Sequence, residues 1–217
     1  MRIGVLALQG DFALHAKALA RCRGASRRTS AVPQADPSEA SGEMAEIEVV
    51  EVRKPGELAG LDGLIVPGGE STTLLRLMEE WQFVPALEKF HAEGRPLFGT
   101  CAGAILMARE VENPRQFSLG LIDIGIERNA YGRQRESFEA PGEAVLDGRP
   151  VPIHMVFIRA PRIRATGAGV QTLASHGGDP VLVQEGRVLV GTFHPELTDD
   201  PTVHQYFCRV VAESRER

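Results

Sequence analysis

The sequence lacks the features that mark nucleic-acid-binding, membrane and secreted proteins. Lysine and arginine number 24 against 29 aspartates and glutamates, giving a formal net charge of −5. Proteins that bind nucleic acid usually carry a basic excess, which is missing here. No apolar run approaches the roughly 18–20 residues that span a bilayer. The short apolar run at the N-terminus ends in a polar turn, so we interpret it as a buried strand and not as a signal peptide.

Cysteine is scarce as well, with only Cys22, Cys101 and Cys208 in 217 residues. Three scattered cysteines are too few for a disulfide framework or a zinc site. We therefore expect a cytoplasmic protein with reduced thiols and no metal. The length and the hydrophobic content of 43% predict one domain, residues 1–217, with a substantial core.

What the sequence does contain is an alternation of short apolar runs with helical patterns. Strands are predicted at 3–8, 47–52, 63–69 and 96–100, and helices at 11–22, 71–80 and 83–93. Ser71, Thr72 and Thr73 suit the N-cap region of the second helix. This alternation predicts an α/β fold with a mixed, mainly parallel sheet flanked by helices.

The second half has a different character, because its strand-like segments follow one another with short connections. They lie at 120–128, 151–158, 170–175, 180–184 and 187–193, before a final helix at 201–214. Residues 185–187 are a plausible tight turn, so we expect some antiparallel pairing here. Residues 24–45, rich in Ser, Ala, Pro and Gly, predict a mobile loop inserted at the surface.

One apolar strand ends in a corner that carries a cysteine. Cys101 stands in the sequence GTCAG, between the predicted strand at 96–100 and the apolar run ILMA. Small neighbours permit a tight strand-to-helix turn, and the N–H groups at the helix start favour an ionised sulfur. The pattern is typical of a nucleophile elbow with cysteine in place of serine, although a single cysteine is more often a core residue.

A cysteine nucleophile needs a base and a group that orients the base. His194 directly follows the predicted strand at 187–193, so it should lie at the same sheet edge as Cys101. Glu196 lies two residues further on and can fix the imidazole tautomer. No comparable partners are found in the sequence for the other histidines, at 15, 91, 154, 176 and 204. We predict that His176 lies in a loop.

Two turns and two arginines complete the candidate site. The PGGEST turn at 67–72 and the turn carrying Gln9 and Gly10 each follow a predicted strand, and their backbone N–H groups can cradle an anion. Arg128 and Arg159 end strands, where a guanidinium often binds a carboxylate. Plain βα turns and surface ion pairs are the alternative interpretations.

These residues resemble a known family. GTCAG, HPE and PGGEST together are similar to the class I (triad) glutamine amidotransferases. The segments IGVLALQG, LIVPGGESTT, FGTCAGAILMA, IERNAYGRQRESFEA, FIRAP and FHPELTDD resemble the glutaminase subunits of pyridoxal 5′-phosphate synthases. They run in order from residue 3 to about residue 200, leaving out 24–45. The resemblance implies a flavodoxin-like three-layer fold.

The resemblance also implies an activity and residue roles. L-Glutamine would be hydrolysed to L-glutamate and ammonia, without a cofactor, and the ammonia would pass to a synthase subunit that makes pyridoxal 5′-phosphate. Cys101 would be the nucleophile, His194 the base and Glu196 its orienting carboxylate. The implied glutamine-binding residues are Gly69, Glu70, Ser71, Arg128, Ile158 and Arg159, and the oxyanion-hole candidates are Gln9, Gly10, Gly69 and Ala102.

Two alternatives to this function stay open at the level of sequence. A glutaminase that feeds another ammonia-using synthase would share the same three residues, although ERNAYGRQ and FIRAP argue against it. A catalytically silent relative, kept as a scaffold, is disfavoured by the intact Cys101, His194 and Glu196. We expect docking on the synthase to order the Gln9–Gly10 turn and to complete the oxyanion hole.

Overall fold

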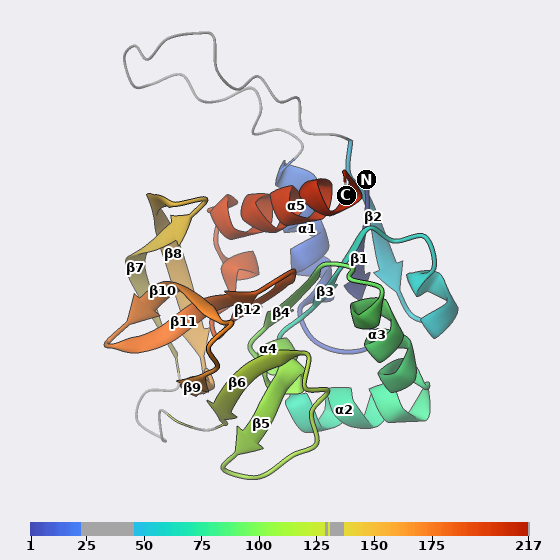
Figure 1. Cartoon of the computed structure of the whole chain (residues 1–217), viewed down its shortest axis with the longest axis horizontal. Coiled ribbons are helices and arrows are strands. Elements are labelled where there is room, and N and C mark those ends of the chain that lie inside the picture. Colours follow the sequence, from blue (N-terminus) through green and yellow to red (C-terminus); the bar gives the residue numbers. More distant parts are fainter. Residues whose placement is uncertain (23–45, 129, 131–136, 217) are drawn as a thin grey trace, which may run out of the picture.

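The computed structural model describes residues 1–22, 46–128, 130 and 137–216. The insertion predicted at 24–45 and part of the IERNAYGRQRESFEA segment lie outside the described residues. A nine-stranded sheet with the order β2-β1-β3-β4-β12-β11-β10-β7-β8 forms the centre of the molecule (Figure 1). A smaller sheet with the order β5-β6-β9 lies beside it.

Five neighbouring strands of the large sheet are parallel, as the alternating pattern predicts. They are β2 (Glu48–Val52), β1 (Arg2–Leu6), β3 (Gly63–Val66), β4 (Leu97–Thr100) and β12 (Val188–Gly191). Successive residues on these strands pack into different hydrophobic clusters: Leu64 and Val66 into one, and Ile65 into the other. Both faces of the parallel half are therefore buried, which explains why its strands are continuous apolar runs.

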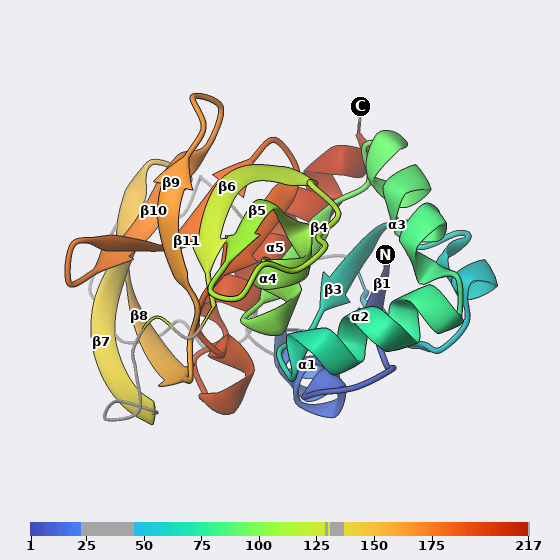
Figure 2. The same ribbon diagram turned by 90° about the horizontal axis from the view of Figure 1, so that it is seen from below.

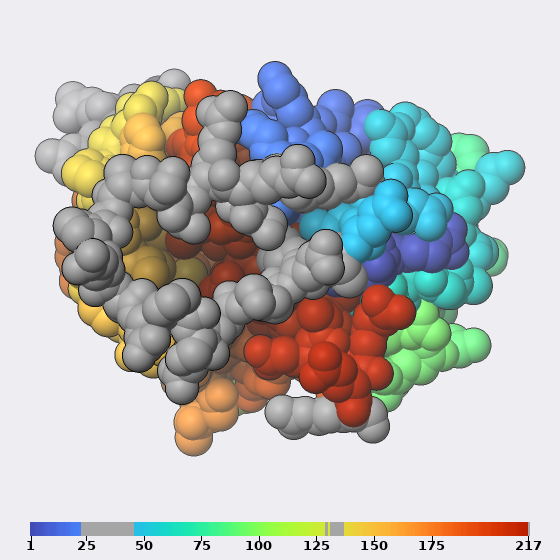
Figure 3. Space-filling view, turned by 90° about the horizontal axis from the view of Figure 1, so that it is seen from above, coloured from blue at the N-terminus to red at the C-terminus, as the bar shows by residue number. Residues whose placement is uncertain are grey.

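Helices cover the two faces and complete three layers. On one face lie α1 (Phe12–Cys22) and α5 (Thr202–Arg215), which contact each other. On the other lie α2 (Ser71–Glu80), α3 (Phe83–Ala92) and α4 (Ala102–Met107), together with the small sheet (Figures 1 and 2). Figure 3 views the first of these faces, with α5 in red beside the N-terminal elements in blue and cyan.

The rest of the large sheet is antiparallel, as the short connections predict. It contains β11 (Asp179–Glu185), β10 (Gln171–His176), β7 (Ser137–Leu146) and β8 (Arg149–Ile158). Glu185 pairs with Val188 across the predicted tight turn. Gly186 in this turn has φ of 56°, which suits a two-residue hairpin. The three-layer α/β prediction is confirmed, with this antiparallel extension at one side.

Three strands escaped prediction. They are β5 (Ala108–Glu112), β7 and β9 (Arg162–Thr166), whereas β6 (Ile122–Glu127) falls within a predicted segment. Strand β7 buries only three of its ten residues, so it has no apolar run to mark it. In the described part of the chain, the remaining elements are two short 3-10 helices, Pro55–Leu58 and Pro195–Leu197. Among the described residues, no helix is both long and apolar enough to cross a membrane.

Candidate active site

Cys101 lies at the corner between β4 and α4, as the GTCAG sequence predicts. Its φ of 46° lies in the left-handed region, which is unusual for a residue with a side chain. The Cys101 N–H donates to the Gly191 carbonyl oxygen at 2.9 Å, and its own carbonyl accepts from Ile105 N–H at 3.1 Å. Gly103 packs so closely on the Val66 backbone that a Cβ atom would overlap it. The small residues of this motif therefore serve the tight turn.

His194 comes to Cys101 from the neighbouring parallel strand. Strands β4 and β12 pair side by side, with Gly191 opposite Thr100, so the residues beyond their carboxyl ends meet at one sheet edge. The His194 N–H donates to the Val156 carbonyl oxygen at 2.8 Å, which fixes the backbone beyond β12. Both side chains line the same pocket, and both lie close to Gly68, where an added Cβ atom would overlap the imidazole and lie 3.3 Å from Cys101 Cβ. The proximity predicted from the strand ends is confirmed.

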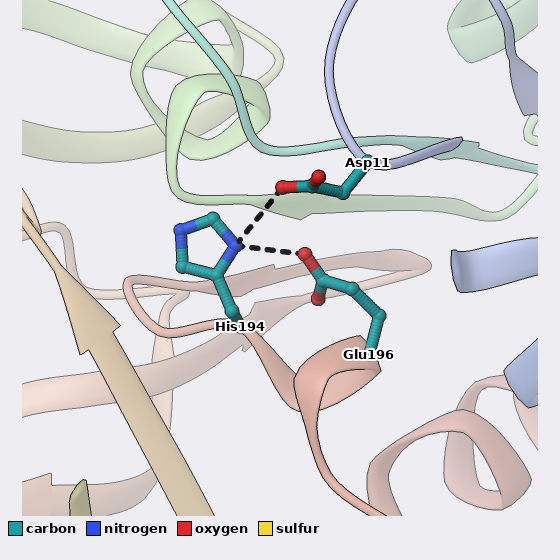
Figure 4. Close-up of side chains that lie close together, drawn as sticks. All are labelled: Asp11, His194 and Glu196. Carbon is teal, nitrogen blue, oxygen red and sulfur yellow. Dashed lines mark hydrogen bonds and ion pairs between the residues drawn. The ribbon is translucent and has the colours of Figure 1, made fainter. Parts of the chain in front are cut away.

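Glu196 holds the other ring nitrogen of His194. Its Oε1 lies 2.7 Å from His194 Nδ1, and both side chains are buried (Figure 4). Burial by itself lowers the pKa of His194, but the hydrogen bonds with Cys101 and Glu196, and the charges of both groups, raise it to about 10. The site therefore favours the imidazolium form of His194.

A pocket of about 190 Å³ opens in front of Cys101 and His194. All six residues implied to bind glutamine line it, namely Gly69, Glu70, Ser71, Arg128, Ile158 and Arg159. Asp11, Ile105 and Pro161, which the sequence did not single out, line it too. Residues from the turn after β3, the end of β6 and the end of β8 thus converge on one cavity.

The charged side of the pocket is anchored by Glu70. This residue is the N-cap of α2, accepting from Thr72 N–H at 3.1 Å and Thr73 N–H at 2.7 Å. The N-cap is therefore one residue earlier than the predicted region Ser71–Thr73. Thr72 and Thr73 donate to the cap, and Ser71 is the first residue of the helix. Partial burial by itself raises the pKa of Glu70, but the hydrogen bonds from Thr73 and Thr72 lower it to about 2.

Arg128 is held in place beside that cap. Its Nη2 donates to Thr72 Oγ1 at 3.0 Å and lies 3.7 Å from Glu70 Oε1. The Arg128 side chain is 14% exposed, so its charge faces the pocket with little screening by water. Arg159 also lines the cavity, with φ of 43°, another left-handed residue at this edge of the sheet. Two guanidinium groups in one small pocket favour a ligand that carries a carboxylate.

The turn with Gln9 and Gly10 packs directly on the PGGEST turn. Gln9 Oε1 accepts from Glu70 N–H at 3.0 Å, and the Gln9 amide fills the space where a Cβ atom of Gly69 would lie. A Cβ atom at Gly68 would overlap His194. Of the oxyanion-hole candidates, Gly69 lines the pocket, whereas Gln9, Gly10 and Ala102 are outside its described lining. Their role in an oxyanion hole stays a prediction.

Two histidines that the sequence left without partners lie directly behind Glu196. His15 on α1 and His204 on α5 are both fully buried, and their rings are hydrogen-bonded between His15 Nδ1 and His204 Nε2 at 2.9 Å. His15 Nε2 lies 3.3 Å from Glu196 Oε2. The expectation that these residues lack partners is wrong. A polar residue within an apolar helical stripe was the available signal, since His15 shares its spacing with Ala18, Leu19 and Cys22.

The loop placement of His176 is also wrong. It is the last residue of β10, and its ring packs against Phe138 and Phe157 at centroid distances of 5.5 and 5.4 Å. His154 lies 3.1 Å from Glu139 on the neighbouring strand β7. His91 belongs to α3, on the other side of the sheet from α1 and α5. These three histidines are separate from the candidate active site.

Asp11, His194 and Glu196 also have the composition of a metal site. One donor atom from each lies within 4.8 Å of the others, and Asp11 Oδ2 is 3.9 Å from His194 Nδ1 (Figure 4). The shorter contact of Glu196 with the same nitrogen is the geometry of a carboxylate that orients a histidine. The geometry therefore supports a base-orienting role without requiring an ion.

A larger cavity, of about 590 Å³, lies at the opposite ends of β4 and β12. Arg109 in its wall is 2.5 Å from Asp123, and Arg187 donates to the Gly94 carbonyl oxygen at 2.8 Å. Neither Cys101 nor His194 is part of its described lining. Size alone would select this cavity, but the chemistry places the candidate active site at the smaller pocket.

Comparison with known proteins agrees with this geometry. The family model described as the SNO glutamine amidotransferase family matches residues 5–213. The chain belongs to this family. A solved structure titled "Crystal structure of glutamine amidotransferase" is 46% identical, with a TM-score of 0.80, and the match covers 97% of this chain and 98% of that one.

Curated relatives share the full length of the family fold. The protein of Thermotoga neapolitana called "Pyridoxal 5′-phosphate synthase subunit PdxT" is 44% identical, over 97% of this chain and 100% of its own. Proteins of the same name from Koribacter versatilis and Solibacter usitatus are 47% and 48% identical, covering 97% and 95% of this chain and 96% and 97% of their own. Membership of the glutamine amidotransferases thus rests on whole-chain similarity and not on GTCAG alone.

Proposed function

We propose that this protein is the glutaminase subunit of a pyridoxal 5′-phosphate synthase, using Cys101, His194 and Glu196. The observation that carries the proposal is the pocket in which Cys101 and His194 face all six implied glutamine-binding residues. The relatives named as synthase subunits PdxT support the choice of synthase. A glutaminase of another synthase would need the same triad but has no comparable support.

In this mechanism the Cys101 sulfur attacks the side-chain amide carbon of glutamine. His194, which lines the pocket beside Cys101 and is hydrogen-bonded to Glu196, gives its proton to the leaving ammonia. The bond between carbon and nitrogen breaks, and a glutamyl thioester remains on Cys101. Water, deprotonated by the same imidazole, then attacks the thioester and releases glutamate. Every proton transfer uses His194, so Glu196 acts by fixing its orientation and charge.

The pocket supplies recognition of the amino-acid end of the substrate. Arg128, fixed by Thr72 and Glu70, is placed to bind the α-carboxylate, with Arg159 in the same lining. Glu70 contributes mainly through its position, because its carboxylate caps α2 and pairs with Arg128. Gly69 and Ser71 line the pocket, where their backbone N–H groups can donate to the substrate.

Docking on the synthase subunit would complete the oxyanion hole. In the present arrangement the Gln9 side chain accepts the Glu70 N–H and fills the space beside Gly69. We propose that docking re-places and orders the Gln9–Gly10 turn, so that N–H groups from Gly10, Gly69 or Ala102 face the developing oxyanion. Such coupling would keep the isolated subunit from wasting glutamine.

The test is ammonia release from glutamine by Cys101→Ala, with the synthase subunit present. We expect a loss of about 10³-fold or more, because the nucleophile is gone, while folding and synthase binding are retained. Cys22→Ala is the matched control, since it removes a buried thiol at the far end of α1. Wild-type ammonia release by Cys101→Ala would overturn the mechanism. Full wild-type activity without the synthase subunit would overturn the docking proposal.

A further inference from the structure

The second oxygen of Glu196 faces a buried pair of histidines that the mechanism above does not use. Glu196 Oε1 serves His194, and Oε2 lies 3.3 Å from His15 Nε2. His15 Nε2 is also 3.0 Å from Thr100 Oγ1, and His15 Nδ1 is 2.9 Å from His204 Nε2. A continuous line of polar side chains therefore runs from Cys101 through His194 and Glu196 to α1 and α5.

Because these side chains are buried, the position of each ring proton decides whether a buried polar atom has a hydrogen-bond partner. His15 and His204 are 0% exposed and Glu196 is 2% exposed, so water cannot satisfy a misplaced donor. Glu196 Oε2 has no hydrogen-bond partner among the described residues, and its contact with His15 Nε2 at 3.3 Å is an ion-pair distance. A buried carboxylate oxygen without a donor destabilises the folded state. His15 Nε2 is the group placed to reduce that cost.

The positions of the neighbouring acceptors select one pair of tautomers. If His15 carries its proton on Nε2, that proton lies between Glu196 Oε2 and Thr100 Oγ1, two acceptors. Its Nδ1 then accepts, so His204 must donate from Nε2. The remaining atom, His204 Nδ1, which has no partner among the described residues, is then an unprotonated nitrogen and not a stranded N–H.

The opposite tautomers would create two unfavourable buried arrangements. With the proton of His15 on Nδ1, its Nε2 lone pair could accept from the Thr100 hydroxyl at 3.0 Å, but it would still face the Glu196 carboxylate at 3.3 Å, which is repulsive. His204 would then accept at Nε2 and carry its proton on Nδ1, where it has no partner in the described part of the chain. One buried repulsion and one buried unsatisfied donor together disfavour this state.

We propose that His15 and His204 are positioning residues for the glutaminase reaction, held as neutral Nε2–H tautomers. His204 Nε2–H donates to His15 Nδ1, and His15 Nε2–H donates to Glu196 Oε2. This donor locks the carboxylate that orients His194, while adding no positive charge that would compete with the imidazolium for Glu196. The assignment of an effect on catalysis rests on the proposed function; the tautomers do not.

The charge balance of the pair supports neutral rings. Burial, followed by the charges of His204 and His194, lowers the pKa of His15 well below its ordinary value. Burial, with the nearby Arg21 charge, lowers the pKa of His204 to about 3. Both rings therefore stay uncharged at neutral pH, and each has one proton to place.

The tautomers are directly measurable on the full-length protein by long-range ¹H–¹⁵N correlation spectra of the histidine rings near pH 7. We expect His15 and His204 both to show a protonated Nε2 and an unprotonated Nδ1, assigned by their loss in His15→Gln and His204→Gln. A protonated Nδ1 on His15, or a charged ring on either residue, would overturn the proposal. This measurement needs neither glutamine nor the synthase subunit.

The effect on catalysis is tested by an isosteric pair of substitutions, assayed with the synthase subunit. A glutamine amide at residue 15 places its NH₂ near the former Nε2, and an asparagine amide places it near the former Nδ1. We expect His15→Asn to lower kcat about 10–100-fold with KM for glutamine unchanged, because His15 lies outside the pocket. His15→Gln should recover most of that loss.

A merely structural role would give another pattern. Both variants would then lose activity in proportion to thermal destabilisation, and they would not differ from each other at equal folded fraction. His91→Gln and His91→Asn, on α3, are matched controls that should both retain wild-type kcat. Equal kcat for folded His15→Gln and His15→Asn would overturn the proposal. If the His15 variants do not fold, kcat of His204→Gln compared with His204→Asn decides by the same criterion.

Discussion

The two sides of Glu196 treat histidine in opposite ways. On the pocket side, His194 has a pKa raised to about 10, and on the helix side, His204 has a pKa lowered to about 3. Burial acts against the charged form in both cases. The difference is that Cys101 and Glu196 both raise the pKa of His194, whereas the charge with the largest effect on His204 is that of Arg21, which lowers its pKa more than Asp200 raises it. Partner charge, and not burial, therefore decides which imidazole becomes a cation.

The two oxygens of the Glu196 carboxylate differ in the same way, in their distances to the two histidines. Glu196 Oε1 makes a 2.7 Å contact with His194, which is the range of a charge-assisted hydrogen bond, and Oε2 makes a 3.3 Å contact with His15. One carboxylate thus stabilises a cation on one side and accepts from a neutral ring on the other. A single acidic residue can serve both because the strand-end His194 and the helix-borne His15 approach different oxygens.

Removing the Glu196 charge should break this comparison most strongly. Glu196→Gln keeps the shape of the side chain but offers His194 Nδ1 an amide in place of an anion. We expect kcat for ammonia release to fall on the order of 10³–10⁴-fold, because the imidazole loses its orientation and charge partner. Steady-state rates with the synthase subunit, on protein shown to be folded by circular dichroism, measure the loss. A decrease of less than tenfold would mean that another group orients His194.

The lowered pKa of His204, on the helix side of Glu196, should affect how the free energy of unfolding depends on pH. Because the folded-state pKa of His204 lies below its unfolded value, the unfolded chain binds a proton on this ring at pH values where the folded chain does not. This residue therefore favours the folded state fully above about pH 6.5, and that contribution is lost as the pH falls toward 3.

The size of this effect follows from linkage. His204→Gln removes the titrating group and keeps a donor near the former Nε2, so its free energy of unfolding should fall less steeply with acid. We expect the slopes to differ by about 1.4 kcal/mol per pH unit between about pH 5.5 and pH 4. Urea unfolding at several pH values measures both slopes. Parallel curves for variant and wild type would show that the His204 ring is protonated in the folded protein.

The residues on the pocket side of Glu196 could be predicted from the sequence, whereas the contacts on its helix side could not, for a physical reason. Cys101 and His194 each follow an apolar strand, and parallel strand ends meet at one edge, so their proximity could be predicted. His15 and His204 lie on helices, where the buried face depends on how α1 and α5 pack against the sheet. Their spacing within apolar stripes predicts burial but not which polar group they meet.

A similar limit applies to the turns and the sheet. The parallel strands were predictable because burial on both faces makes them apolar throughout, whereas β7, with one face exposed, was missed. The cap of α2 was misplaced because Ser71–Thr73 are good caps by residue type, and only the geometry shows Glu70 accepting the N–H groups of Thr72 and Thr73. Local propensity could not decide between adjacent residues that are all able to cap.

The smallest expected effect concerns Asp11, the second carboxylate near His194. Its Oδ2 lies 3.9 Å from Nδ1, and its side chain is 43% exposed, so water screens the interaction. Asp11→Asn should change kcat by no more than about fivefold, since such a pair contributes about 1 kcal/mol or less. The same ammonia-release assay compares it with Glu196→Gln. If the two substitutions were equally damaging, the orienting role would be shared across the pocket, and the contrast between the buried and exposed sides of His194 would fail.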